Sequence, residues 1–117
     1  MQLSSKVQEY DIWLMYLRFA DKIETGKVRP VLIVEIEGTV LYVAKITSGD
    51  PQEKYNDVQI EEWELSGLHK PSSVRCESLF KVTSEDLLRD TPIGSLSLLD
   101  RNKVLEELIS LGFLSSE

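Results

Sequence analysis

The pattern of apolar and polar positions predicts strands in the first two thirds of the chain. Tyr10–Phe19 is rich in aromatic and branched residues and predicts a first strand that is apolar on both faces. Val31–Ile36 and Thr39–Thr47 predict a hairpin that turns at Glu37–Gly38, with Gly38 supplying a positive φ angle. The polar segment 20–27, closed by Gly26, is expected to be a loop.

Two further strands are expected after this hairpin. A short strand is predicted at Val58–Ile60, between two polar connections. A longer strand at Ser73–Val82 alternates in the way that gives a strand two different faces. Its residues divide into Val74, Cys76, Ser78 and Phe80 on one face, and Arg75, Glu77, Leu79 and Lys81 on the other. Residues 1–9 are expected to be a loose tail.

Helical signals are confined to the last third of the chain. Ser84 is a candidate cap for a short helix through Arg89. Ser97 begins a final helix that Gly112 ends, because serine caps helix starts and glycine follows helix ends. Its apolar stripe consists of Val104, Leu105, Leu108 and Ile109. Strands first and a helix last predict a mainly β (α+β) fold, a small bent antiparallel sheet or barrel covered by the C-terminal helix.

Composition is that of one ordinary globular domain spanning residues 1–117. Hydrophobic residues make up 42% of the chain and charged residues 28%. No apolar run approaches the ~20 residues of a membrane-spanning helix, and the first residues lack the apolar core of a secretion signal. The single cysteine, Cys76, excludes an internal disulfide and a cysteine-rich metal site. We therefore expect a cytoplasmic protein without a membrane partner.

The charge distribution leaves room for a local basic patch on an acidic protein. The formal net charge is −7, which argues against general affinity for nucleic acid. The acids gather in two segments, 53–64 and 85–117. Outside them lie the bases that could converge: Arg18, Lys22, Lys27, Arg29, Lys45, Lys70, Arg75 and Lys81.

Polar side chains stand at several strand ends in otherwise apolar surroundings. They are Arg29, Thr47 with Ser48, Arg75 and Glu77. Arg75 and Glu77 are two residues apart on one strand, so their side chains leave the same face. Such a pair is either a surface ion pair or an acid–base arrangement in which the guanidinium holds developing negative charge. Spacing alone favours the surface ion pair.

The order of several short motifs resembles the PemK/MazF family of toxins from bacterial toxin–antitoxin pairs. The resemblance runs from about Tyr10 to Leu108. Its most specific pieces are R-P-V at the start of the second strand, I-T-S at the end of the third and V-R-C-E on a late strand. The matching segments are YDIWLMYL, GKVRPVLIVE, VAKITSGD, GLHKPSSVRCESLFKV and IGSLSLLDRNKVLEEL.

This resemblance implies an SH3-like barrel that forms a homodimer and cleaves single-stranded RNA without a metal or other cofactor. The products would be a 2′,3′-cyclic phosphate and a 5′-OH end. Arg29 matches the family's phosphate-binding arginine, and Thr47 and Ser48 match its hydroxyl residues. The family's acid–base roles would fall on Arg75 and Glu77. RNA contacts are also expected from Lys27, Lys45 and Lys70. The expected partners are RNA and a cognate antitoxin, with DNA binding as a further property.

Several residues depart from the family pattern. Some members carry a histidine before the R-P motif, where this chain has ADKIETGK, and Glu77 replaces the more familiar aspartate. These departures and the acidic charge leave a second hypothesis open. In it the barrel has lost catalysis and serves as an RNA-binding or protein-binding module.

The remaining candidate residues favour structural roles. His69, the only histidine, is predicted to lie in a surface loop, and Cys76 is predicted to be a buried small apolar residue rather than a nucleophile. Trp13 is expected in the core. Trp63 could stack on a base, but packing under a loop is the favoured interpretation.

Overall fold

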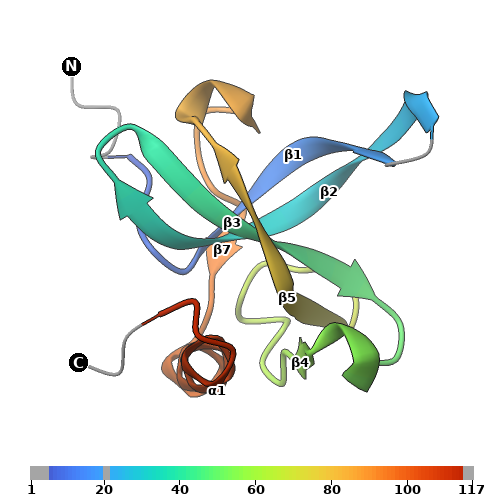
Figure 1. The fold of residues 1–117 in the computed structure, drawn as a ribbon, viewed down its shortest axis with the longest axis vertical. Helices are drawn as coiled ribbons and strands as arrows, with labels where there is room; N and C mark the ends of the chain where they lie inside the picture. The colour runs from blue at the N-terminus through green and yellow to red at the C-terminus, as the bar shows by residue number, and fades with distance from the viewer. Residues whose placement is uncertain (1–5, 20–21, 115–117) are drawn as a thin grey trace.

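In the part of the chain that the structure describes, seven strands form a single bent sheet and one α-helix covers part of it (Figure 1). The computed structural model describes residues 6–19 and 22–114. The strands run in the order β4-β5-β3-β2-β1-β6, and β7 also pairs with β1. The elements are β1 (Asp11–Phe19), β2 (Lys22–Glu37), β3 (Val40–Ser48), η2 (Glu53–Tyr55), β4 (Asp57–Gln59), β5 (Ser72–Val82), η3 (Ser84–Asp86), β6 (Leu87–Leu88), β7 (Gly94–Ser95) and α1 (Leu98–Ser110).

The β1–β2 hairpin is longer than the sequence pattern predicts. The prediction of a loop over 20–27 is wrong from Lys22 onward, because β2 begins there and pairs Lys27 with Leu17. Residues 20–21 lie outside the described part of the chain. A polar sequence suits this ribbon, since the ladder to β1 satisfies the backbone while the ribbon projects from the body of the molecule (Figure 1).

The β2–β3 hairpin agrees closely with the prediction. Gly38 has a φ angle of 61°, as the turn requires. The pairing of Glu37 with Val40 shows that the two-residue loop is Gly38–Thr39, one residue later than predicted. β4 also begins one residue earlier than predicted and ends at Gln59.

Both faces of the sheet carry a hydrophobic cluster, which explains the nearly continuous apolar runs of β1 and β2. The first cluster packs the sheet against α1 and includes Ile12, Leu32, Ile46, Val74, Val104 and Leu108. The second lies on the opposite face and includes Val7, Trp13, Val31, Ile33, Val43 and Leu87. The burial of Trp13 confirms its predicted place in the core.

The expected tail at 1–9 is wrong in its last part. Val7 is only 3% exposed and packs in the second cluster. The Tyr10 N–H also donates to the Ile33 carbonyl at 2.6 Å, which fastens this segment to β2. Residues 1–5 lie outside the described part of the chain.

The simple alternation predicted for β5 breaks halfway along the strand. Val74 and Cys76 are buried as predicted, but a register shift follows, and Phe80 pairs with Val43. Leu79 packs against the first cluster, whereas Phe80 is 39% exposed. Extra residues in a bulge exchange the two faces of a strand, so Leu79 and Phe80 take the opposite of their predicted roles.

The short helix predicted from Ser84 to Arg89 is also wrong. Thr83, rather than Ser84, caps a single 3₁₀ turn, and the Thr83 N–H donates to Asp86 at 2.9 Å. The chain then extends into β6, where Leu87 pairs with Met15 and is buried. Pairing with β1 and burial of Leu87 therefore outweigh the local helix signal.

The final helix confirms the predicted start and stop. Ser97 caps α1 by accepting a hydrogen bond from the Asp100 N–H, and Gly112 follows the helix with a φ angle of 85°. Asp100 is fully buried and accepts hydrogen bonds from the N–H groups of Glu61 and Glu62, both at 2.8 Å. This carboxylate fastens the 61–67 segment to the helix. The mostly β half-barrel with a C-terminal helix is the predicted fold class.

Candidate functional site

Arg75 forms a two-point ion pair with a carboxylate that sequence reasoning missed. Its Nε donates to Asp57 Oδ1 at 2.9 Å, and its Nη2 donates to Asp57 Oδ2 at 3.0 Å. The Asp57 side chain is 0% exposed and that of Arg75 is 18% exposed. The Tyr55 ring also lies against the guanidinium, 4.1 Å from its carbon to the ring centroid. We name Tyr55, Asp57 and Arg75 the arginine anchor.

The arginine anchor fixes the protonation of both charged partners. Its hydrogen bond to Asp57 raises the pKa of Arg75 further above its ordinary value. Burial alone would raise the pKa of Asp57, but hydrogen bonds from Arg75 and from the Gln52 N–H lower it overall, with help from the Lys45 charge. Arg75 therefore stays a cation, with the rest of its N–H groups left for other acceptors.

Local backbone geometry places Tyr55 and Asp57 on either side of a sharp bend. Asn56 adopts a left-handed conformation with a φ angle of 56°, ends η2 and leads into β4. Its side chain donates to Glu107 of α1 at 3.1 Å, and its carbonyl accepts from the Cys76 N–H at 3.2 Å. Asparagine tolerates this conformation better than most residues. The bend is thus fastened to both α1 and β5.

Strand register gathers several predicted site residues on the face that carries the arginine anchor. Lys45 pairs directly with Arg75, and Thr47 pairs with Ser73, so all four share one face. The Thr47 hydroxyl donates only a long hydrogen bond, 3.4 Å, to the Ser48 carbonyl. The Ser73 hydroxyl is buried and has no hydrogen-bond partner among the described residues.

A cavity of about 150 Å³ lies where β3 and β5 meet the 67–70 loop. We name it the cationic pocket. Its apolar walls come from Leu14, Pro30, Ile46, Leu68 and Ile93. Its polar lining comes from Arg29, Ser48, His69, Lys70 and Ser72. Three of the residues predicted to bind RNA or act on it, Arg29, Ser48 and Lys70, therefore meet at one cavity.

The cationic pocket and the arginine anchor adjoin at the ends of β3 and β5. Ser48 pairs with Ser72, and both line the pocket. Their sequence neighbours Thr47 and Ser73 pair on the face of the arginine anchor. Because neighbouring strand residues point to opposite faces, the candidate site extends around the strand ends from one face to the other.

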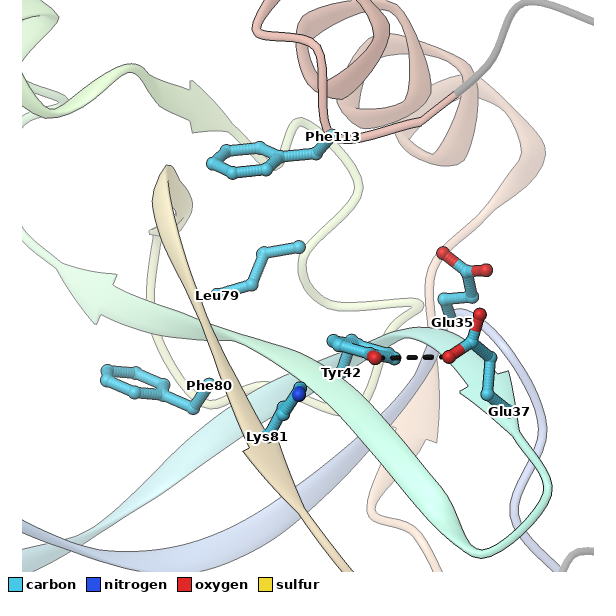
Figure 2. A pocket seen from close by; sticks show the side chains of 7 residues that line it. All are labelled: Glu35, Glu37, Tyr42, Leu79, Phe80, Lys81 and Phe113. Carbon is cyan, nitrogen blue, oxygen red and sulfur yellow. Dashed lines mark hydrogen bonds between the residues drawn. The ribbon is translucent and has the colours of Figure 1, made fainter.

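A second hollow, of about 810 Å³, has a different character (Figure 2). It is lined by Glu35, Glu37, Tyr42, Leu79, Phe80, Lys81 and Phe113, and we name it the acidic hollow. The Tyr42 hydroxyl donates to Glu37 at 3.1 Å, as Figure 2 shows. This hydrogen bond is the main reason that the pKa of Tyr42 is raised. None of the predicted site residues lines this hollow.

Two predicted site residues lie outside these groups. Glu77 is exposed in the bulged part of β5, and it influences Arg75 only through longer-range electrostatics, while Asp57 makes the ion pair. Lys27 is exposed on β2 opposite Leu17 and lines neither hollow.

The residues given structural roles from the sequence keep them. Burial raises the pKa of the Cys76 thiol to about 12, so the thiol stays protonated near neutral pH. Trp63 is partly buried against the first cluster, in agreement with the favoured interpretation that it packs rather than stacks on a base. His69 is exposed in a loop as predicted, but this loop brings it to the same cavity as Arg29.

Among residues 6–19 and 22–114, no three or more His, Cys, Asp or Glu side chains are grouped so that they could hold a metal ion. Within the same ranges, no helix has the length and apolar character needed to span a membrane.

Comparisons with known proteins cover most of the chain. Residues 8–111 match the family model described as "PemK-like, MazF-like toxin of type II toxin-antitoxin system". A comparison with curated proteins gave no match.

Solved structures share the fold. The Mycobacterium tuberculosis toxin MazF-mt6 is 27% identical, with a TM-score of 0.66 over 90% of this chain and 98% of its own. A structure described as "Crystal structure of Mtb toxin" is 28% identical, with a TM-score of 0.57 over 70% of this chain and 90% of its own.

A mycobacterial endoribonuclease in complex with its cognate antitoxin is 13% identical, with a TM-score of 0.66 over 93% of this chain and 96% of its own. At that identity the likeness concerns the fold alone. The family match covers most of the chain and agrees with the half-barrel and its C-terminal helix. The chain therefore belongs to the family of PemK-like and MazF-like toxins of type II toxin–antitoxin systems.

Proposed function

We propose that this toxin is an endoribonuclease that cleaves single-stranded RNA at selected sequences, leaving 2′,3′-cyclic phosphate and 5′-OH ends without a metal ion. The observation that carries the proposal is the arginine anchor, which holds a cationic guanidinium beside Thr47 and Lys45. A guanidinium fixed in this way is still suited to a phosphate group, because Asp57 occupies only its Nε and Nη2 edge and the remaining N–H groups can donate to phosphate oxygens.

The reaction requires the 2′ oxygen to attack phosphorus while the bond from phosphorus to the 5′ oxygen breaks. In our proposal Arg29 binds the scissile phosphate, and the Thr47 hydroxyl donates to one of its oxygens, with Ser48 beside it. Glu77 accepts the proton of the 2′-OH, and its exposure on β5 leaves it accessible to substrate. The departing 5′ oxygen takes a proton from water.

Arg75 serves as a charge stabiliser rather than a proton donor in this proposal. The family resemblance implies an acid–base role for the arginine, but Asp57 raises the pKa of Arg75. A guanidinium that releases its proton even less readily than usual is a poor general acid. It is instead suited to the negative charge that develops on the phosphorane oxygens.

The remaining parts of the proposal concern partners and location. Lys27, Lys45 and Lys70 add charge contacts to the RNA backbone. We propose a cytoplasmic homodimer that a cognate antitoxin inhibits. The antitoxin-bound structure of a protein with this fold makes that partner a reasonable one to test.

The test uses the purified protein beside Arg29→Ala and Glu77→Gln on a long mixed-sequence RNA with EDTA present. We expect discrete cuts with cyclic phosphate ends from the wild type and none from Arg29→Ala. Lys81→Ala is the matched control, since Lys81 lies on the acidic hollow.

Equal cutting by wild type and Arg29→Ala would point to a contaminating nuclease and would overturn the proposal. An absence of cuts from the folded wild type would also overturn it. Retained RNA binding in that case would favour a catalytically inactive barrel that acts as a binding module.

A further inference from the structure

We infer that the cationic pocket holds one nucleobase of the RNA, next to the phosphate that Arg29 binds, and thereby selects one position of the cleavage motif. The inference rests on the proposed function, because it assigns the substrate group that this cavity receives. It assigns part of the sequence preference to the 67–70 loop.

The shape of the cationic pocket fits a flat heteroaromatic group. Its volume of about 150 Å³ suits one base rather than a whole nucleotide. Leu14, Ile46 and Ile93 supply apolar walls for the faces of a ring. Specific small-molecule sites have this character, a mostly apolar cavity with a few polar groups that fix orientation.

The positive charge at the rim of the cationic pocket complements the phosphodiester group that accompanies every base in RNA. Arg29 and Lys70 line the cavity, and no acidic side chain of the described residues does so. On a protein whose formal net charge is −7, this local pair of cations complements a phosphodiester. The acidic hollow has the opposite arrangement, with Glu35 and Glu37 against Lys81.

The loop that closes the cationic pocket is fixed before any ligand arrives. A Cβ atom added at Gly67 would lie 2.1 Å from the Ile93 carbonyl oxygen, and one at Gly94 would lie 2.0 Å from that of Ser66. These close backbone approaches show that the loop packs against Ile93 and the start of β7 with no room for a side chain between them. The Ser72 hydroxyl adds a 2.9 Å hydrogen bond to the Lys70 carbonyl. A preformed wall favours discrimination between bases, because the 67–70 loop does not have to become ordered when RNA binds.

Two side chains at the cationic pocket remain available to contact the edge of a base. His69 is exposed and makes no hydrogen bond or ion pair within the described part of the chain. The Ser48 hydroxyl is also exposed, whereas the Ser72 hydroxyl already donates to Lys70. Single-stranded RNA presents unstacked base edges to such groups. We therefore assign His69 and Ser48 as the residues that distinguish one base from another.

The experiment measures binding and cleavage separately. A short 2′-O-methyl RNA that cannot be cleaved is varied one base at a time, and its binding is followed by fluorescence anisotropy. We expect the wild type to prefer one base by about 10-fold at one position or more. His69→Ala should reduce that preference to about 3-fold or less at a single position only, and Lys81→Ala should leave every preference unchanged.

A second variant blocks the cationic pocket without changing the core. Ser48 is exposed at its rim, so Ser48→Trp should cover the cavity while the protein keeps its unfolding temperature. We expect about 10-fold weaker binding of the preferred RNA and little change for RNA with another base at that position. An unchanged preference in both His69→Ala and Ser48→Trp would overturn the inference.

The two proposals can fail independently. If the wild type cleaves RNA but both variants keep the same cleavage motif, the pocket assignment fails and the ribonuclease stands. If the wild type binds with a base preference that these variants alter, yet cuts no RNA, the ribonuclease fails and the pocket assignment stands.

Discussion

Two hollows in the described part of this protein differ in the property that matters for binding RNA, and the larger of them is the poorer candidate. The acidic hollow has about 810 Å³ and the cationic pocket about 150 Å³. Yet the larger one is lined by Glu35 and Glu37, which would repel a phosphate. The smaller one is lined by Arg29 and Lys70, which would attract it. Charge at the rim therefore identifies the candidate site better than volume does.

The two regions also differ in how firmly they are built. The acidic hollow includes Leu79 and Phe80 from the bulged half of β5, where the strand register shifts. Gly67 lines the cationic pocket and lies too close to Ile93, another lining residue, for a side chain to fit between them. Fixed geometry and positive charge thus occur together, as pre-organised phosphate chemistry requires.

The largest expected effect comes from replacing Arg75 with lysine. Arg75→Lys keeps the charge but loses the two-point ion pair to Asp57 and the planar contact with Tyr55. We expect the cleavage rate to fall about 100-fold or more, since a misplaced stabiliser of developing charge costs about that much. Initial rates on a single-stranded RNA measure it. Lys81→Arg, on the acidic hollow, should leave the rate unchanged, and a rate unaffected by Arg75→Lys would contradict the role of the arginine anchor.

A glycine pair tests whether the pocket wall is as tight as the structure indicates. Gly67→Ala would force its Cβ to 2.1 Å from the Ile93 carbonyl oxygen, and Gly67 has a φ angle of +87°. We expect a loss of about 2–4 kcal/mol in the free energy of unfolding, from backbone strain and overpacking together. Urea unfolding measures it.

Gly38→Ala is the matched control, because Gly38 has a φ angle of +61° with nothing within 4 Å of an added Cβ. It should cost only about 1 kcal/mol of strain. Equal losses in the two variants would show that the Gly67 contact relaxes freely, and the argument for a preformed pocket would fail.

Asp57→Asn tests the arginine anchor through pH. The pKa of Asp57 is lowered in the folded protein, so its stabilising contribution is present above the unfolded pKa of about 3.9 and is lost as pH falls through the folded value. We expect the wild type to be more stable than the variant by about 2 kcal/mol at pH 7, and the gap to close below about pH 4. Urea unfolding of both proteins across pH 3–7 measures this difference in stability. A difference that stays constant across this range would contradict the prediction. Glu37→Gln, at an exposed pair, should stay within about 0.5 kcal/mol throughout.

Much of the fold could be predicted from local signals, and the errors have a common cause. The positive φ at Gly38 and the cap at Ser97 depend on neighbouring residues, and both predictions are confirmed. The helix predicted from Ser84 and the alternation through Phe80 failed because pairing with distant strands decided the outcome. Tertiary pairing overrides local preference in such short segments.

The candidate site could be predicted only where local motifs identify its residues, because the rest depends on the pairing of distant strands. Short motifs pointed to Arg29, Ser48 and Lys70, which the structure brings to one cavity. The motifs gave no hint of Asp57, which becomes visible only when β4 pairs with β5 and places it opposite Arg75. A carboxylate directly before the predicted strand Val58–Ile60 was the one available signal. His69 was predicted only to lie in a surface loop, and its place in the lining of this cavity depends on how that loop packs.

Salt dependence should separate the two regions by a smaller margin. Lys70 lines the cationic pocket, and each phosphate contact by a lysine adds about 0.7 to the slope of log affinity against log salt for single strands. We expect Lys70→Ala to reduce that slope by about 0.7, and Lys81→Ala to leave it unchanged. Anisotropy titrations between low and physiological salt measure both. If Lys70→Ala and Lys81→Ala reduced the salt slope equally, RNA would contact both hollows. The contrast in RNA binding between the two hollows would then be wrong.

The smallest expected effect belongs to the acidic hollow itself. The pKa of Tyr42 is raised mainly by its hydrogen bond to Glu37, and the Glu35 charge contributes last among the causes. Glu37→Gln should therefore lower the pKa of the Tyr42 phenol toward its ordinary value, and Glu35→Gln should lower it less. An NMR titration of the Tyr42 ring measures both shifts. Equal pKa shifts in the two variants would mean that the summed charge of the acidic hollow, rather than the hydrogen bond to Glu37, raises the pKa of Tyr42. If the negative charge of the acidic hollow repels RNA, Glu37→Gln and Glu35→Gln should then increase RNA affinity equally. If RNA contacts only the cationic pocket, neither variant should change RNA affinity.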